Sequence, residues 1–372
     1  MEAQFSTDRK KKNIGYMISL VSAAVNGHQP VEPTDDINFG MVYKFLKLHT
    51  LANTAFYAVE KLEHKPETEL LKKWRDERNM GVHKNMIQTL EFAAFTDALK
   101  QNKIEYMPIK GFPLCELYPK PDYRMMSDVD VVVREKDMKK GGEIILGLGY
   151  SPVMVGSIHH DEYNKPPFMI IELHHDMVAR DSRFFKYYEG IMDRAEKVGD
   201  YERKLSDEDF FIFVLVHLNK HFEDSGTGIR SLLDLYLLNE KSLPKLDREY
   251  VFSELEKLGL TEFYEKMTAI GRKWFSDEDY SDFSDDEIYI IRSTAFGLDE
   301  YEYKNRKGDL SEAAFLKKRL FPSYAWMKDH YPSVRRFPPV LPFAYVYRIF
   351  RGLIKNRKKI KTEIEVLNED KK

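Results

Sequence analysis

The sequence predicts an α+β fold, in which a mixed β-sheet core is flanked by an N-terminal and a C-terminal helical domain. Two kinds of pattern lead to this prediction. The middle of the chain holds several short extended runs, and residues 129–133, Val-Asp-Val-Val-Val, are the most strand-like of them. On either side, apolar residues recur at the three- and four-residue steps of amphipathic helices. We therefore expect a helical part over residues 1–100, the α/β core over 101–200, and a second helical part with a basic tail over 201–372.

The N-terminal part opens with an apolar segment that has to be distinguished from a signal peptide. Residues 14–25 follow three consecutive lysines, but polar residues interrupt the apolar run and two acidic residues precede it. Ile18, Val21 and Val25 fall on one helical face, so the segment is predicted to be the first helix of the fold. A further helix is expected around residues 87–98, just before the core begins.

The central part alternates between strand and helix signals. In chain order we first expect a strand over 104–109 and a short helix that opens at 112–113. A strand over 129–133 and a charged helix from about 136 follow, and the glycines at 147 and 149 end that helix. The last two strands are expected over 150–155 and 168–173. The last two strands are expected to be joined by a polar loop that contains His159, His160 and Asp161. Parallel and antiparallel pairing in one sheet follows from this order of elements.

Helical patterns return after residue 200. A capping-box sequence at residues 206–209 precedes the first of these helices. The expected helices cover 210–216, 231–238, 250–258 and 260–274. Residues 277–286 are acidic and indicate a loop or an exposed helix start, and the tail from Arg348 onward is basic, which is typical of a solvated helix face.

Composition narrows the class of protein. The 372 residues are 43% hydrophobic and 32% charged, enough apolar material for a packed core. The net charge is −3, so no overall basic field favours nucleic acid. The single cysteine, Cys115, excludes an intramolecular disulfide and fits a reducing compartment. No apolar stretch reaches the roughly 20 residues of a membrane span, and we expect a soluble cytoplasmic protein.

Asp128 and Asp130 are the first candidate site residues. Residues two apart on a strand point to the same face, so these carboxylates lie side by side while Val129 faces the core. Two adjacent anions repel unless a cation lies between them. Hard oxygen ligands with room for water and phosphate suit magnesium, or manganese in its place. Taken alone, such a pair is more typical of a solvated strand end or turn, and the neighbouring residues shift the interpretation to a metal site.

Neighbouring residues strengthen this interpretation. Lys110-Gly111 ends the preceding strand, where a glycine lets backbone amides approach a phosphate closely. Arg124 and Ser127 precede the aspartates and are candidates to reach phosphate oxygens. Glu172 is a lone acid in an otherwise apolar strand, a position that is costly unless the carboxylate faces a metal or a partner.

Taken together, these residues resemble a known superfamily. The run from Lys110-Gly111 through a helix and Arg124 to residues 127–133, followed by a helix that ends near Gly149, is similar to the DNA polymerase beta-like nucleotidyltransferases. More narrowly, the chain resembles their uncharacterised nucleotidyltransferase family, over roughly residues 85–240. The resemblance implies a nucleotidyltransferase-type sheet and a metal-bound nucleoside triphosphate.

The resemblance also places residues farther along the chain. Glu172 matches the position of the superfamily's third carboxylate, so that Asp128, Asp130 and Glu172 would form the metal site. The helix with His217, Lys220 and His221, and the next helix with Asp234, resemble the downstream helical motif of the family. These residues and His174, which shares a strand face with Glu172, are the candidates that line a substrate pocket.

Two features leave alternatives open. His159-His160-Asp161 and His174-His175-Asp176 invite a zinc or iron hydrolase site, but adjacent histidines on a strand point to opposite faces, and no His-Glu-x-x-His spacing is present. Asp234 is expected either to orient one of the helix histidines or to pair with Arg230, four residues earlier.

The leading functional hypothesis is transfer of a nucleoside monophosphate from a nucleoside triphosphate to an acceptor hydroxyl, with Mg²⁺ (or Mn²⁺) and release of pyrophosphate. Glu172 would complete the metal site or act as the general base. A small molecule or a protein is favoured as acceptor over a long nucleic acid because the chain is mildly acidic. Phe112 replaces the serine or glycine usual after Gly111, so the alternative is a catalytically inactive, nucleotide-binding regulatory protein of the same fold, such as a toxin–antitoxin partner.

Overall fold

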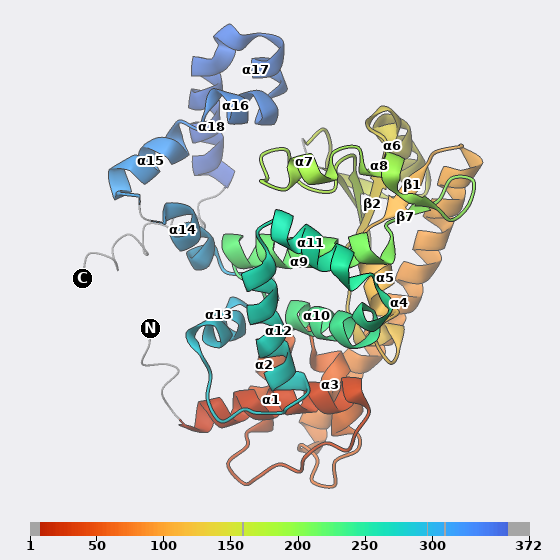
Figure 1. Ribbon diagram of the computed structural model, residues 1–372, viewed down its shortest axis with the longest axis vertical. Coiled ribbons are helices and arrows are strands. Elements are labelled where there is room, and N and C mark those ends of the chain that lie inside the picture. Colours follow the sequence, from red (N-terminus) through yellow and green to blue (C-terminus); the bar gives the residue numbers. More distant parts are fainter. Residues whose placement is uncertain (1–7, 158–159, 296, 309, 356–372) are drawn as a thin grey trace.

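The computed structural model describes residues 8–157, 160–295, 297–308 and 310–355. Its N-terminal part consists of the helices α1 (Asp8–Asn26), α2 (Phe39–Leu48), α3 (Ala52–Val59) and α4 (Thr68–Gln101). Figure 1 shows α4 running from the other N-terminal helices up to the β-sheet. The expected first helix is confirmed as α1, and the helix expected around residues 87–98 is the second half of α4.

The central part is built around a five-stranded mixed sheet. Its strands are β1 (Tyr106–Pro108), β2 (Val129–Val133), β3 (Ser151–Met154), β4 (His160–Lys165) and β5 (Met169–His174). Their order in the sheet is β1-β2-β5-β4-β3, with β2 and β5 parallel and every other neighbouring pair antiparallel. The elements around the sheet are α5 (Gly111–Cys115), α6 (Met138–Gly147), α7 (Phe185–Tyr188), α8 (Ile191–Arg194), and a small hairpin of β6 (Glu196–Lys197) and β7 (Arg203–Lys204). The α+β class with a mixed sheet and flanking helices is therefore confirmed.

Strand β4 corrects the prediction of a polar loop between the third and last strands. Its sequence, His-Asp-Glu-Tyr-Asn-Lys, has only one strongly apolar side chain, Tyr163, so no hydrophobic pattern indicated a strand. The strand forms because its backbone pairs on both sides, with β3 and with β5. His159, part of the same predicted loop, lies outside the described residues.

The C-terminal part is helical, and short 3-10 turns occur both there and in the central part. Its helices are α9 (Asp207–Asp224), α10 (Ile229–Lys241), α11 (Arg248–Lys257), α12 (Thr261–Phe275), α13 (Asp285–Ser293), α14 (Asp299–Lys307), α15 (Glu312–Leu320), α16 (Tyr324–His330), α17 (Pro332–Arg336) and α18 (Leu341–Lys355). The 3-10 turns are Pro121–Tyr123, Glu135–Asp137, Leu243–Lys245 and Pro338–Val340. Ser206 caps α9 as predicted, since its side chain accepts a hydrogen bond from the Asp209 backbone N–H at 3.0 Å.

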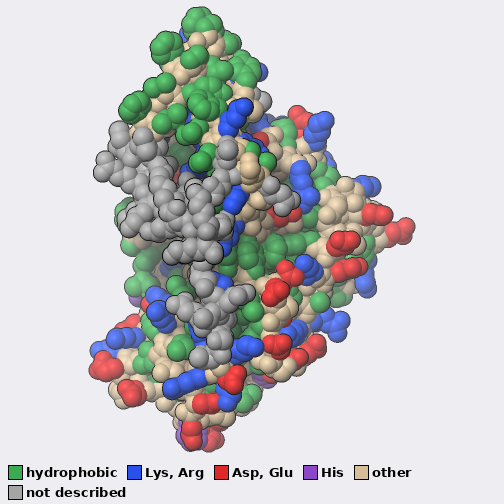
Figure 2. Space-filling model, turned by 90° about the vertical axis from the view of Figure 1, so that its left-hand side faces the viewer, with side chains coloured by type: hydrophobic (Ala, Val, Ile, Leu, Met, Phe, Trp, Pro, Cys, Tyr) green, Lys and Arg blue, Asp and Glu red, His purple; other side chains and the backbone are tan. Residues whose placement is uncertain are grey.

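The last helices carry an apolar surface. Figure 2 shows hydrophobic side chains gathered at the end of the molecule that α16–α18 form, and the exposed ones include Phe337, Phe343, Tyr347 and Phe350. The tail that was predicted to be a solvated helix face begins at Arg348, and its residues 356–372 lie outside the described residues. In the described part, Phe350 is exposed between Arg348 and Arg351. No helix among the described residues is both long and apolar enough to cross a membrane.

Two cores lie on the two sides of the sheet. One face, with Val129, Val131 and Leu173 among its residues, packs against α4 and α6. The larger core joins the N-terminal helices to α9–α13 on the other side and includes Val132. N- and C-terminal helices therefore share one core. The division of the chain into three separate domains stays a prediction.

His49 ties the N- and C-terminal helices together in its neutral form. It is 1% exposed, its Nε2 lies 3.0 Å from the Ile291 carbonyl oxygen, and its Nδ1 accepts a hydrogen bond from the Ile229 N–H at 3.3 Å. One ring nitrogen must donate and the other accept, so the ring carries a single proton. Burial lowers the pKa of His49 to about 4, from an ordinary value of 6.5.

This histidine is expected to make the protein sensitive to acid. Because its pKa is lower in the folded than in the unfolded chain, its stabilising contribution is complete above pH 6.5 and is lost as the pH falls toward 4. The linkage amounts to about 2 kcal/mol between pH 7 and pH 5. The free energy of unfolding in urea would be measured for wild type and His49→Gln at pH 7 and at pH 5. Between these pH values it should fall by about 2 kcal/mol less in the variant than in wild type. The same substitution at exposed His83 should leave the pH dependence unchanged; equal pH dependence in wild type and His49→Gln would contradict the assignment.

Candidate active site

The alternation of side chains along β2 and β5 gathers three acidic groups on one face of the sheet. Asp130 pairs with Glu172 across the parallel strands, so both side chains point to the same side, and Asp128 lies two residues before Asp130. Val129 and Val131 point to the opposite, buried face. The carboxylates predicted to form the metal site are therefore neighbours at the centre of the sheet.

Lys110 reaches into this acidic group. It is the residue before α5, and its Nζ lies 2.9 Å from Asp130 Oδ1. Burial by itself lowers the pKa of a lysine, but the attraction of Asp130 and Asp128 outweighs burial and raises the pKa of Lys110. In this structure the ammonium therefore occupies part of the position that a cation would take between the carboxylates.

His174 lies beside the same carboxylates. Its Nε2 is 3.2 Å from Asp130 Oδ1 and 3.2 Å from Glu172 Oε2. Burial opposes its protonation, but hydrogen bonding to these two carboxylates raises the pKa of His174 overall. A substrate-lining histidine was predicted here from its shared strand face with Glu172, and the register of β5 brings the two side chains into direct contact.

His160, which the sequence offered only for the rival zinc or iron site, lies beside the carboxylates. It pairs with His174 across β4 and β5, and its Nε2 lies 3.8 Å from Glu172 Oε1. Sequence reasoning placed it in a loop, where its partner strand could not be recognised. Ligand atoms of His160, Glu172 and His174 lie within 4.8 Å of one another, a group able to hold a metal ion. A histidine-containing centre, treated as a rival interpretation, therefore overlaps the carboxylate site.

The two aspartates differ in their tendency to hold a proton. Burial favours the neutral acid for both, but Lys110 and His174 lower the pKa of Asp130 far below its usual range. At Asp128, burial and the adjacent Asp130 charge raise the pKa above its usual range. Repulsion between two close carboxylates has this effect when no cation neutralises them. The two neighbouring carboxylates therefore differ in protonation because Lys110 and His174 stabilise the charge of Asp130 more than that of Asp128.

Two cavities meet at these residues, with volumes of about 250 and 240 Å³. Both are lined by Lys110, Asp128, Asp130, His217 and His221. The first continues toward Gly111, Arg124, Ser127 and Asp234, and the second toward Glu172, His174 and Lys220. All twelve site residues predicted from the sequence line one or both cavities, although the role of each remains a prediction.

The family of the chain can be stated at this point. A family model described as uncharacterised nucleotidyltransferase matches residues 35–276, which include the sheet, helices α9–α12 and every lining residue of the two cavities except Ala295. The chain belongs to this family. No curated protein matches it. The resemblance noted in the sequence is confirmed, and α13–α18 lie beyond the matched part of the chain.

Gly111 has a packing role in the nucleotidyltransferase. A Cβ atom at this position would lie 2.5 Å from Met126 Sδ, closer than side-chain atoms tolerate. The glycine therefore lets the segment that leads to Asp128 pass directly beside the start of α5. This close approach keeps Lys110 and Ser127 on the same cavity wall.

Asp234 pairs with neither of the partners expected for it. Its two oxygens accept hydrogen bonds from Arg124 Nε at 2.8 Å and Arg124 Nη2 at 3.0 Å, and Tyr118 donates to it at 2.7 Å. Arg124 was predicted to contact phosphate, yet the two-pronged ion pair already engages its guanidinium, with side-chain exposures of 10% and 6%. The pair ties the segment before β2 to α10.

Helix α9 provides the wall opposite the sheet. His217 and His221 lie one turn apart with ring centroids 4.4 Å from each other. Burial, with nearby Lys220 and Lys110, lowers the pKa of His221 to about 4 and that of His217 well below 6.5. Burial also lowers the pKa of Lys220. Both imidazoles are therefore neutral near pH 7 and available to exchange hydrogen bonds with a ligand.

Proposed function

We propose that the protein transfers a nucleoside monophosphate from a nucleoside triphosphate to an acceptor hydroxyl. One observation carries the proposal: Asp128, Asp130 and Glu172 share one sheet face, beside Lys110, where two cavities meet in a chain of the nucleotidyltransferase family. A site with room for two ligands on either side of a carboxylate cluster suits a reaction that joins two substrates.

The carboxylates would hold the metal. Asp128, Asp130 and Glu172 offer hard oxygen ligands, which fit Mg²⁺ or Mn²⁺. The bound ion would neutralise charge on the triphosphate. The raised pKa of Asp128 supports this fit, because a carboxylate that repels its neighbour gains most from a cation. Lys110, now paired with Asp130, would then turn to a phosphate oxygen.

The reaction would proceed by in-line displacement at the α-phosphorus. A bond forms between the acceptor oxygen and the α-phosphorus as the bond to the bridging oxygen of the β-phosphate breaks, and pyrophosphate leaves. Glu172 would complete the metal site or, in the alternative, take the hydroxyl proton as the general base, with His160 3.8 Å from it and His174 3.2 Å from it. Gly111, Ser127 and Arg230 line the cavity that would hold the triphosphate, and Arg124 would position the segment before β2 through Asp234.

The second cavity would hold the acceptor. It combines polar groups from Glu172, His160 and Lys220 with apolar walls from Phe184 and Phe213. Such a mixed wall suits a small molecule or a protein side chain that carries the attacking hydroxyl. A long nucleic acid is less favoured by the net charge of −3.

Pyrophosphate release and nucleotide binding, measured together, test the proposal. Each of the four ribonucleoside triphosphates would be incubated with Mg²⁺ or with EDTA, across small-molecule hydroxyl acceptors and the protein itself. Release that requires Mg²⁺ is the expected result. Nucleotide binding that requires Mg²⁺ without release would support the alternative, an inactive nucleotide-binding homologue with Phe112 after Gly111. Absence of Mg²⁺-dependent binding to all four nucleotides would contradict both.

A further inference from the structure

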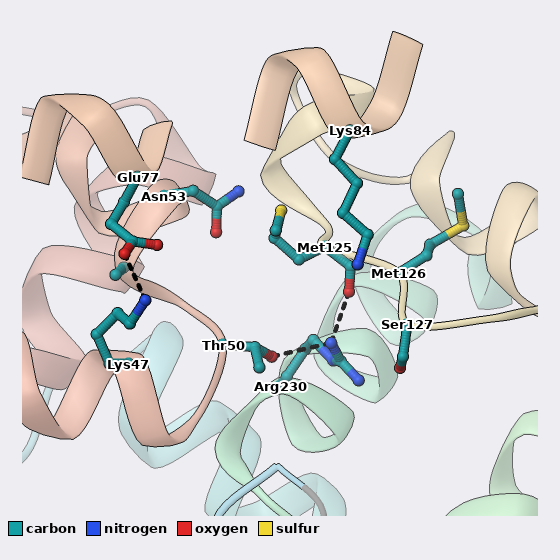
Figure 3. A pocket seen from close by; sticks show the side chains of 10 residues that line it. Lys47, Thr50, Asn53, Glu77, Lys84, Met125, Met126, Ser127 and Arg230 are labelled. Carbon is teal, nitrogen blue, oxygen red and sulfur yellow. Dashed lines mark hydrogen bonds and ion pairs between the residues drawn. The ribbon is translucent and has the colours of Figure 1, made fainter. Parts of the chain in front are cut away.

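A third cavity lies beside the candidate active site, between α4, α10 and the segment that leads into β2. Its volume is about 130 Å³. Figure 3 shows Lys84 extending from α4 and Arg230 from α10 toward the same segment, Met125 to Ser127. Met126, Ser127 and Arg230 also line the cavity assigned to the triphosphate, so the two spaces adjoin. We call this third cavity the basic pocket.

The basic pocket contains more positive than negative charge. Its lining includes Lys47, Lys84, Arg230 and one acid, Glu77. Glu77 is paired with Lys47 at the far side of the pocket. Within the described part of the chain, neither Lys84 nor Arg230 forms an ion pair with a carboxylate. The nearest carboxylates act on these cations only from a distance: Asp128 attracts both Lys84 and Arg230, and Asp234 attracts Arg230.

Arg230 is held in a fixed position despite lacking an acid. Its Nη1 donates to Thr50 Oγ1 at 2.9 Å and to the Met125 carbonyl oxygen at 2.6 Å. Both acceptors are neutral and bind only one of the three guanidinium nitrogens. Burial lowers the pKa of Arg230 and of Lys84, which shows that both cations are partly withdrawn from water.

Arg124, which lines the same cavity as Arg230, shows the usual arrangement of a buried cation, in which a carboxylate pairs with it. Its charge is matched by Asp234 through two hydrogen bonds. Leaving a partly buried cation unmatched costs free energy, and such groups are normally paired or bind a ligand. Arg124 has a carboxylate in direct contact, whereas Arg230, on the same cavity wall, contacts only neutral acceptors among the described residues, which indicates that Arg230 is placed to bind an anionic ligand.

We propose that the basic pocket binds a phosphate group, contacted by Lys84, Arg230 and Ser127. A guanidinium, an ammonium and a hydroxyl together offer the several donors that a tetrahedral oxyanion with multiple acceptor oxygens requires. This inference rests on the proposed function, in which the phosphate group can belong to the end of the nucleoside triphosphate or to a phosphorylated acceptor. Both supply the same chemistry to the pocket.

Inorganic phosphate is the probe. Its dissociation constant would be measured by ³¹P NMR titration of the full chain in EDTA, so that no metal site contributes. Lys84→Met is expected to weaken phosphate binding about ten-fold, which corresponds to about 1.4 kcal/mol. Lys84→Arg should retain binding because it keeps the charge. Lys73→Met, which removes an exposed lysine from the same helix, is the matched control and should bind as wild type does.

Equal phosphate affinity in wild type and Lys84→Met, or equal weakening in Lys73→Met, would overturn the proposal. Thermal unfolding of each variant shows that it is folded. Adding a saturating Mg²⁺–triphosphate distinguishes the sources: displacement of phosphate assigns the pocket to the nucleotide, and continued binding assigns it to the acceptor. If inorganic phosphate binds but no nucleotide does, the phosphate site in the basic pocket is supported and only the proposed function is refuted.

Discussion

Asp130→Asn is expected to lower the rate of nucleotidyl transfer by about a thousand-fold, equivalent to about 4 kcal/mol of transition-state stabilisation. Asp130 is the most enclosed of the three carboxylates, with 3% exposure, and contacts both Lys110 and His174. The amide keeps the shape but removes the charge that would bind the metal. The rate of pyrophosphate release at saturating nucleotide and Mg²⁺ is the measurement.

A matched control separates this effect from general loss of acidic charge. Glu143 is an exposed carboxylate on α6, 4.0 Å from Lys139, and such surface pairs contribute little. Glu143→Gln should therefore release pyrophosphate at the wild-type rate. If Asp130→Asn, shown by circular dichroism to be folded, keeps more than a tenth of the wild-type rate, Asp130 does not belong to the catalytic centre.

Arg124→Met is expected to have the largest effect on stability. The substitution leaves the Asp234 carboxylate buried, with only Tyr118 as a hydrogen-bond donor. Removing one partner from a buried ion pair costs about 3–5 kcal/mol. The free energy of unfolding in urea, measured near neutral pH, should fall by that amount.

The double variant Arg124→Met/Asp234→Leu tests whether the loss comes from the stranded charge. With both charged groups replaced by apolar ones, the double variant should be more stable than Arg124→Met alone, since apolar replacement of a whole buried pair is often nearly neutral. If the double variant instead loses the sum of the unfolding free energies lost by Arg124→Met and by Asp234→Leu, the ion pair is not the source of the effect.

Much of the fold could be predicted because local patterns and tertiary packing agree. The β-branched run at β2 and the apolar residues of α9–α12 lie on the faces that pack in the core. In α4 the helix was predicted correctly but its buried face was not: Leu90 is exposed, and Phe95 and Leu99 pack in the core instead. Strand β4 could not be predicted, because its order comes from backbone pairing with β3 and β5 and not from apolar side chains.

The candidate site was predictable to a similar degree. Asp128 and Asp130 stand out because two acids alternate within an apolar strand, and Glu172 stands out as a lone acid in another. His160 required the register of β4, and the partner of Asp234 lies 110 residues away, beyond any local pattern. Lys84 gave no signal at all, because a lysine on a long helix is normally solvated, and it lines the basic pocket only through the tertiary arrangement of α4, α10 and residues 125–127.

The position of the bound metal tests the central claim most directly. Crystals soaked with Mn²⁺ and a non-hydrolysable nucleoside triphosphate would reveal the ion by its anomalous scattering. We predict an ion about 2.2 Å from oxygens of Asp128, Asp130 and Glu172, in contact with the triphosphate. An ion held by His160, Glu172 and His174 without Asp128, or a nucleotide bound away from these carboxylates, would contradict the account.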